Sequence, residues 1–516
     1  MNLIRNYIII VILIFSHFAC IQKNSTDNNL RKKTSKTPES SEKYSGTITQ
    51  KELKDHVYYL SDDNLRGRLT GSKGAEKAIE YICKNLRSYN VKPFFQNGNS
   101  YTSDFIIDNK KQNECYIENE HGRIIQGEDF MELYCNYYGE EETELIFIGY
   151  GQESDYENIT VTGKLVTYFT GQPGMTDYIE DLEIQKRMLA SEKGAVGTIL
   201  FDMNDDEVTP YINSIKRIFS QAGHYFHLSP REAKHQPRII VSVSSALAKL
   251  FGINRDAFYD IKEKLDKGEK LTTNFRTKIK MKTSYDIKKT YDGKNLIGMV
   301  EGSSNKDEFI ILSAHYDHLG MDNNQVYNGA DDNATGVSAL LEIADAFSKA
   351  ISEGHYPKRN ILFFFTGAEE LWMTGSQYFI NQELIPNKKI IANINIDMIG
   401  REDANRPDLK NFVYVYCSLN GKNDLNELLE NSDKINPSGL DFEKRDSYKG
   451  SDHYSFERAG IPVIAYSTGH SKDYHQTSDI ASRIRFGNFH TITQSVFTTT
   501  WELANHPKSI RRIVSK

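Results

Sequence analysis

Four polar clusters between His315 and Asp397 constrain this chain more than any other feature of its sequence. They are AHYDHLG (314–320), NGADDNATG (328–336), FTGAEE (365–370) and NINIDMIG (393–400). Three of them lie at or near the end of an apolar run, at 309–312, 360–365 and 390–396. Short continuous apolar runs are typical of strands that are buried on both faces, as in parallel sheets. The stretch therefore predicts parallel strands that end in polar side chains.

The segment 333–350 lies between the first two strands and has the pattern of a helix. Its apolar side chains fall on one helical face: Val337, Leu340, Leu341, Ala344 and Phe347. A strand, a helix and a strand in this order indicate an α/β fold. Ligand sites in open α/β sheets form at the carboxyl ends of the strands. We therefore expect the imidazole and carboxylate groups to share one crevice.

The length and charge of the chain limit its organisation and its partners. With 516 residues, two or more domains are expected. The 63 basic and 70 acidic residues leave a net charge of −7, which argues against a general nucleic-acid binder.

The N-terminus has the pattern of an export signal. Arg5 precedes an apolar run at 7–15 that is too short to span a membrane, so residues 1–20 are predicted to be a signal peptide. Cys20 follows this run as in a bacterial lipoprotein cleavage site. We expect lipidation at Cys20 and an exported protein held at the cell envelope, on the periplasmic or outer-membrane face, with simple secretion as the alternative. The polar segment 21–47 suits a flexible tether.

The remaining cysteines are Cys83, Cys115, Cys135 and Cys417, and no pair of them has metal-ligand spacing. Isolated buried thiols are the expected state.

Three further segments follow the tether. Residues 48–109 are predicted to form helices that pack on the C-terminal domain, because Thr49 and Glu52 have the spacing of a capping box and Leu53, Val57 and Leu60 form a helical stripe. Residues 110–282 are predicted to form an inserted β-rich module without chemistry of its own. An exposed strand at 273–283 and a separate strand at 295–300 lead into the C-terminal domain, residues 283–516, whose last helix is expected near 491–503.

The polar clusters carry the ligands that zinc prefers. Histidine and carboxylates without thiolates suit zinc or another divalent metal, and a pair of metals needs a carboxylate that binds both. The Asp331-Asp332 pair could supply this bridge. Glu369 and Glu370 are adjacent at a strand end, so their side chains diverge, one to bind metal and one to move protons. His475 could complete the site from a later loop.

These motifs resemble the co-catalytic di-zinc aminopeptidase family, which includes bacterial leucine aminopeptidases and, more distantly, glutamate carboxypeptidase. The segment LRGRLTGS (65–72) is similar to the family's N-terminal segment, and VTGKLV (161–166) and KGAVG (193–197) are similar to a protease-associated domain. The resemblance implies a mixed, mostly parallel sheet flanked by helices on both faces, the zinc exopeptidase (phosphorylase/hydrolase-like) fold.

Carried over by position, the resemblance implies two Zn²⁺ per chain. One would bind His315 and Asp397, the other would bind Glu370 and His475, and Asp331 would bridge them. It further implies Glu369 as general base, Asp317 as the carboxylate that orients the His315 ring, a cis peptide between Asp331 and Asp332, and residues 445–456 near the substrate pocket. Asp479 is expected to fix the His475 loop.

The resulting hypothesis is a metal-dependent exopeptidase. We expect an aminopeptidase that removes N-terminal residues from peptides through a hydroxide activated by two zinc ions. Two alternatives stay open: a glutaminyl cyclase with a single zinc, and a non-catalytic, receptor-like binding protein on the same fold.

Overall fold

The computed structural model describes residues 38–133, 139–174, 180–203, 225–229, 238–270, 275–417, 424–445 and 449–507. The predicted signal peptide, Cys20, Cys135 and residues 21–37 of the predicted tether lie outside these ranges. No helix in the described ranges is long and apolar enough to cross a membrane.

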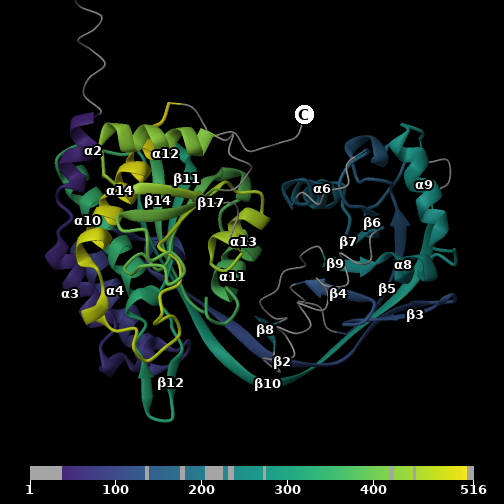
Figure 1. Ribbon diagram of the computed structural model, residues 1–516, viewed down its shortest axis with the longest axis horizontal. Coiled ribbons are helices and arrows are strands. Elements are labelled where there is room, and N and C mark those ends of the chain that lie inside the picture. Colours follow the sequence, from purple (N-terminus) through teal and green to yellow (C-terminus); the bar gives the residue numbers. More distant parts are fainter. Residues whose placement is uncertain are drawn as a thin grey trace, which may run out of the picture.

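The C-terminal body is built on a mixed sheet with the strand order β17-β16-β18-β15-β11-β14-β10 (Figure 1). Strands β14, β11, β15 and β18 are parallel, whereas β16 is antiparallel to β18 and β10 is antiparallel to β14. This arrangement confirms the predicted mostly parallel sheet. The strand bounds are β10 Arg276–Val300, β11 Asn305–His315, β14 Arg359–Thr366, β15 Ile390–Ile396, β16 Phe412–Cys417, β17 Asp441–Arg445 and β18 Val463–Ser467.

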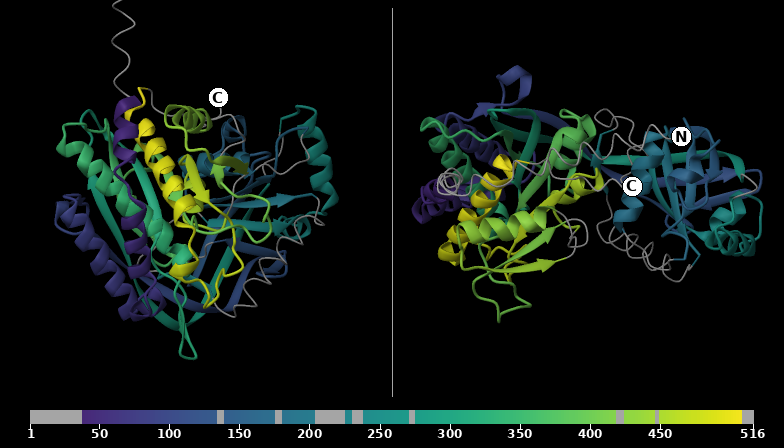
Figure 2. Two further views of the ribbon diagram at one scale, coloured as in Figure 1. Left: turned by 60° about the vertical axis from the view of Figure 1, so that its left-hand side comes forward. Right: turned by 90° about the horizontal axis from the view of Figure 1, so that it is seen from above.

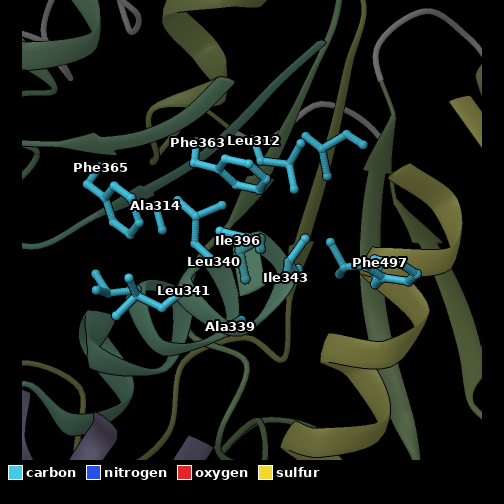
Figure 3. Packing of buried hydrophobic residues seen from close by; sticks show 14 of the residues in the cluster. Leu312, Ala314, Ala339, Leu340, Leu341, Ile343, Phe363, Phe365, Ile396 and Phe497 are labelled. Carbon is cyan, nitrogen blue, oxygen red and sulfur yellow. The ribbon is translucent and has the colours of Figure 1, made fainter. Parts of the chain in front are cut away.

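Helices cover both faces of this sheet, as expected. One face packs on α3 (Gln50–Leu60), α4 (Lys73–Ser88), α10 (Gly336–Ser352), α12 (Asp424–Ile435) and α14 (Phe486–Asn505). Leu340 of α10 lies against Leu312, Phe363 and Ile396 of the strands (Figure 3). The other face packs on α11 (Thr374–Gln382) and α13 (His453–Arg458). Successive strand residues such as Ile311 and Leu312 therefore belong to different cores.

The N-terminal helices confirm the capping prediction and shorten the tether. Thr49 caps α3, and its side chain accepts a hydrogen bond from the Glu52 amide at 3.1 Å. A further helix, α2 (Pro38–Ser45), packs on α14 and α10, with the buried Tyr44 ring 5.8 Å from the Trp501 ring. Residues 38–47 therefore belong to the folded body. The tether prediction was wrong there because the Tyr44 ring and hydrogen bonds from Asn436 and Gln494 to Ser45 anchor an otherwise polar segment.

Two long antiparallel strands, β2 (Thr102–Asn119) and β10, join the body to the insert (Figure 1). The prediction of two strands at 273–283 and 295–300 was wrong, because β10 is continuous. Its middle, 286–290, is exposed and has a single apolar side chain, Ile287, so hydrophobic periodicity does not reveal it. Pairing with β2 from Leu296 to Lys280 supplies its backbone hydrogen bonds.

The insert stands beside the body (Figure 2) and has its own core. Strands β5, β6, β7 and β9 are parallel, and β4 pairs antiparallel with β9. The core contains Phe147, Phe169, Phe201 and Phe258. The bounds are β3 Gly122–Ile125, β4 Phe130–Leu133, β5 Gly139–Phe147, β6 Leu165–Phe169, β7 Gly197–Asp202, β8 Tyr225–Leu228, β9 Arg238–Val243, α6 Glu180–Glu192, α8 Ser244–Leu250 and α9 Asp256–Asp266.

Candidate metal centre

The predicted site residues meet at the carboxyl ends of adjacent strands. His315 ends β11, Glu369 and Glu370 follow β14, Asp397 follows β15, and the chain after β18 leads to His475. Since β18, β15, β11 and β14 are neighbours in the sheet, their carboxyl ends place these side chains around one crevice.

Two groups of nitrogen and oxygen atoms share one carboxylate, that of Asp332. In the first group, His315 Nε2 lies 3.3 Å from Asp332 Oδ1 and 3.2 Å from Asp397 Oδ1. In the second group, His475 Nε2 lies 3.2 Å from Asp332 Oδ2 and 3.2 Å from Glu370 Oε2. Each Asp332 oxygen thus faces a different group, which is the arrangement that a bridging carboxylate requires.

These separations fit zinc. With bonds of about 2.0 Å, the ligand atoms of a tetrahedral zinc lie about 3.3 Å apart. The four separations of 3.2–3.3 Å match this edge length. Both groups offer imidazole nitrogen and carboxylate oxygen without a thiolate, a donor set that zinc accepts. Besides His475, the His318 imidazole lies with Asp332 and Glu370 in a cluster that could hold a metal ion.

Asp331 does not have the bridging position that the resemblance implied. Its Oδ1 accepts a hydrogen bond from the Gly400 amide at 2.8 Å, and its side chain belongs to neither group. Ala330–Thr335 forms a helical turn that is irregular at Asp332 (φ −105°, ψ 92°), and only one member of the Asp-Asp pair faces the crevice. Asp332 is that member. The cis peptide likewise lies between Asp332 and Asn333, one residue later than expected.

Asp479 holds the Asp331-Asp332 turn in place. Its carboxylate accepts hydrogen bonds from the Asp331 amide at 2.9 and 3.1 Å and from the Asp332 amide at 3.1 Å. Because Asp479 also ends the segment that contains His475, it ties this segment to the shared carboxylate. Asp479 was expected to fix only the His475 loop. Its hydrogen bonds show that it also fixes the Asp331-Asp332 turn.

The Asp317 carboxylate was expected to orient the His315 ring, but it contacts other groups. His315 Nδ1 lies 3.3 Å from the Asp317 carbonyl oxygen and 3.9 Å from the Asp317 carboxylate. The carboxylate instead accepts hydrogen bonds from the Glu369 amide at 3.1 Å and from the Thr70 hydroxyl at 2.9 Å. Burial raises the pKa of Asp317 to about 6. Asp317 therefore positions His315 with its backbone and Glu369 with its side chain.

Glu369 and Glu370 diverge as predicted. Glu370 belongs to the second group, whereas Glu369 lines the cleft, with its Oε2 4.0 Å from His315 Nε2. Burial raises the pKa of Glu369 well above its usual range, and the neighbouring Glu370 and Asp397 carboxylates act in the same direction. Burial also disfavours ionised Asp332, but the surrounding imidazoles outweigh it and hold that pKa well below its usual range.

Arg68 connects the N-terminal segment to the site. Its buried guanidinium donates to four carbonyl oxygens, those of Leu60, Tyr316, Asn328 and Gly329, at 2.5–2.9 Å. Burial lowers the pKa of Arg68 to about 10, so the group stays charged at neutral pH. The contacts of Arg68 and Thr70 explain why the sequence motif at 65–72 occurs together with the four polar clusters that carry the candidate ligands.

A cleft with about 460 Å³ of empty space, part of it open to solvent, adjoins both groups. Its described lining residues are Asp332, Glu369, Asn395, Asp397, Met398, Tyr416, Gly450, Ser451, His453, Ala465, Tyr466, Ser467, His470, Tyr474 and His475. Residues 450–453 thus lie at the cleft, as the resemblance implied. Ser451 accepts a hydrogen bond from Asn395, and Asp452 accepts one from Thr366, so neither side chain acts as a helix cap.

Sequence reasoning missed Asp332 as the shared carboxylate, and it missed His318. The His318 ring is fully buried and lies 2.7 Å from Glu370 Oε1. The second histidine of the AHYDHLG motif was the available signal for it.

The mixed sheet, with paired nitrogen and oxygen groups at its carboxyl edge that could hold metal ions, is the arrangement expected of a zinc metallopeptidase. Residues 295–500 match Peptidase family M28. All the predicted ligands and the cleft lie within these residues, whereas Arg68 and Thr70 lie outside them.

Curated relatives include peptidases of two specificities. The chain is 26% identical to the Glutamate carboxypeptidase 2 homolog of Caenorhabditis briggsae over 363 residues, 60% of this chain and 44% of that protein. It is 27% identical to Aminopeptidase YwaD of Bacillus subtilis over 267 residues, 48% of this chain and 53% of that protein. The chain thus spans about half the length of these relatives.

Among solved structures, an aminopeptidase from Aneurinibacillus sp. strain AM-1 aligns over 92% of this chain and 98% of its own. The TM-score is 0.47 and the identity is 18%.

Proposed function

We propose that this protein is an aminopeptidase that uses two zinc ions to remove N-terminal residues from peptides. The observation that carries the proposal is the position of Asp332, whose two oxygens face two separate histidine and carboxylate groups. In the first group it is joined by His315 and Asp397, and in the second by Glu370 and His475.

The charge of the cleft favours a substrate with a free amine. Asp332, Glu369 and Asp397 line it, and none of its described lining residues is lysine or arginine. Carboxylates attract an ammonium group, whereas recognition of a terminal carboxylate commonly uses arginine or lysine. We therefore place the N-terminus of the peptide in this cleft and infer aminopeptidase rather than carboxypeptidase specificity.

Glu369 is the proposed general base. When bound, zinc lowers the pKa of a water molecule to about 7 and polarises a carbonyl oxygen. Glu369 lines the cleft beside the first group and has no part in either ligand set, so its carboxylate is free to take the proton of the attacking water. The same group then delivers this proton to the leaving nitrogen. Its raised pKa suits a group that must hold the proton between the two transfers.

The two alternatives have less support. A glutaminyl cyclase with a single zinc does not account for a carboxylate whose two oxygens face two groups, at 3.3 Å from His315 and 3.2 Å from His475. A binding protein on an inactive peptidase fold does not account for complete ligand sets at zinc-like separations.

Matched peptides test the proposed specificity. One peptide carries a free amine and an amidated C-terminus, and a second has the same sequence with an acetylated N-terminus and a free carboxylate. An aminopeptidase cleaves only the first, and it loses this activity when a chelator removes zinc. Cleavage of the acetylated peptide alone would overturn the assignment.

We further propose that the insert is a protease-associated domain and that the protein is exported and lipidated at Cys20. The motifs at 161–166 and 193–197 and the apolar run before Cys20 support these proposals. Cys20→Ser should release the protein from the membrane fraction of the producing bacterium. Unchanged membrane association would contradict the lipid anchor.

A further inference from the structure

His318 lies beside the second ligand group although the predicted ligand set does not contain it. It follows β11 in the same motif as His315, and its side chain is fully buried. Its Nδ1 atom is 2.7 Å from Glu370 Oε1 and 3.7 Å from Asp332 Oδ2.

The two oxygens of Glu370 have different neighbours. Oε1 contacts His318, and Oε2 faces His475 at 3.2 Å. A carboxylate that is held at one oxygen cannot rotate freely about its terminal bond. The contact with His318 therefore keeps the other oxygen directed toward the second group.

Close packing fixes the His318 ring. A Cβ atom on residue 329 would lie 2.5 Å from the His318 ring. Glycine at this position, with φ 57°, therefore leaves the space that the imidazole fills. The His318 amide donates to the Arg68 carbonyl at 3.3 Å. Nε2 is buried and has no hydrogen-bond partner among the described residues. A proton on Nδ1 rather than on Nε2 avoids burying an unpaired N–H group at Nε2.

The distances distinguish a hydrogen bond from direct ligation. Two ligands of one tetrahedral zinc lie about 3.3 Å apart. The separation of 2.7 Å between His318 Nδ1 and Glu370 Oε1 is shorter than this and lies in the range of a charge-assisted hydrogen bond. Glu370 Oε2 and His475, by contrast, have the ligand spacing.

We infer that His318 is a positioning residue for the second zinc. Its Nδ1–H donates to Glu370 Oε1, so that Oε2 stays directed toward His475 and Asp332. Hydrogen bonds of this kind to a metal ligand raise metal affinity, and their loss typically lowers that affinity about 10- to 100-fold. The inference rests on the proposed two-zinc function.

Two variants of His318 test the inference. In His318→Asn, the side-chain amide can place an N–H donor close to the position of Nδ1. In His318→Leu, a side chain of similar size has no donor. Zinc affinity is measured by competition with a chromogenic chelator, which resolves the tighter and the weaker site.

The expected result is a selective loss. His318→Leu should bind one zinc as the wild type does and the other about 10- to 100-fold more weakly, and His318→Asn should recover most of that affinity. Equal affinity of the Leu variant and the wild type at both sites would overturn the inference. Equal weakening in both variants would overturn the hydrogen bond as its basis.

A measurement on the unmodified protein covers the case in which His318→Leu does not fold. Histidine-selective nitrogen labelling of the zinc-loaded protein should reveal an exchange-protected Nδ1–H signal that is absent from folded His318→Asn. Absence of this signal from the wild type would contradict the inference. A wild type that binds fewer than two zinc ions would instead refute the proposed function.

Discussion

The guanidinium of Arg68 lies 2.9 Å from the carbonyl oxygen of Gly329, which precedes the shared carboxylate Asp332 by three residues. This contact makes a residue from the N-terminal segment part of the support for the metal centre. The same guanidinium donates to Tyr316, between His315 and His318, so it fixes both ligand-bearing turns at once. The site therefore requires the N-terminal segment as well as the strands of the body.

Replacing Arg68 should reduce the stability of the whole body. Arg68→Met leaves four buried carbonyl oxygens without their donor, and a buried unsatisfied group costs about 1–3 kcal/mol. We expect a loss of at least about 3 kcal/mol in the free energy of unfolding, measured with urea. Arg66→Met is the control, because Arg66 is exposed, and its effect should stay within about 0.5 kcal/mol. Similar effects of both variants would contradict this account.

The two adjacent aspartates should respond differently to the same substitution. Asp332→Asn removes a carboxylate that both ligand groups share, so zinc content should fall at both sites and activity should be lost. Asp331→Asn should retain zinc, because Asp331 contacts the Gly400 amide rather than the ligands, at a cost of about 1–3 kcal/mol in stability. Loss of zinc from the Asp331 variant alone would restore Asp331 as the bridge.

Removing the proposed base should separate binding from turnover. Glu369→Gln keeps the size of the side chain and both ligand groups, so zinc content should be unchanged. The rate constant kcat should fall about 10²- to 10⁴-fold, the usual contribution of a general base. Glu370→Ala is the comparison, since it removes a ligand and should lower zinc content. Near-normal turnover by the Gln variant would remove Glu369 from the mechanism.

The buried thiols should be unreactive in the folded protein. Burial raises the pKa of Cys83 to about 11 and that of Cys417 to about 12. Raising a thiol pKa lowers its thiolate fraction, which at pH 8 is then about one thousandth or less. Alkylation with iodoacetamide, followed by peptide mass spectrometry, should modify both residues only in denaturant. Rapid modification under native conditions would show that these positions open to solvent.

The prediction of isolated buried thiols is confirmed for the described cysteines. Cys83, Cys115 and Cys417 are free and buried.

The core strands of the body were predictable because their apolar runs are continuous. Phe363 and Phe364 belong to the cores on opposite faces, so neither face of β14 needs polar residues and the run stands out in the sequence. The middle of β10 was not predictable, because residues 286–290 are exposed, have a single apolar side chain, Ile287, and are kept in a strand by pairing with β2.

The site was predictable as a set of clusters but not in full at the level of single residues. An Asp-Asp pair indicates that one of its carboxylates faces the crevice. Which of the two does so depends on hydrogen bonds from the Asp331 and Asp332 amides to Asp479, a residue far along the chain. His318 was missed because its role depends on the direction of Glu370, which only the folded structure shows.

Zinc content tests the central claim most directly. The purified protein, dialysed against buffer with trace zinc, is analysed by inductively coupled plasma mass spectrometry and by native mass spectrometry. The shared Asp332 predicts two zinc ions per chain, with both lost in Asp332→Asn. One zinc or none in the wild type would contradict the two-metal site.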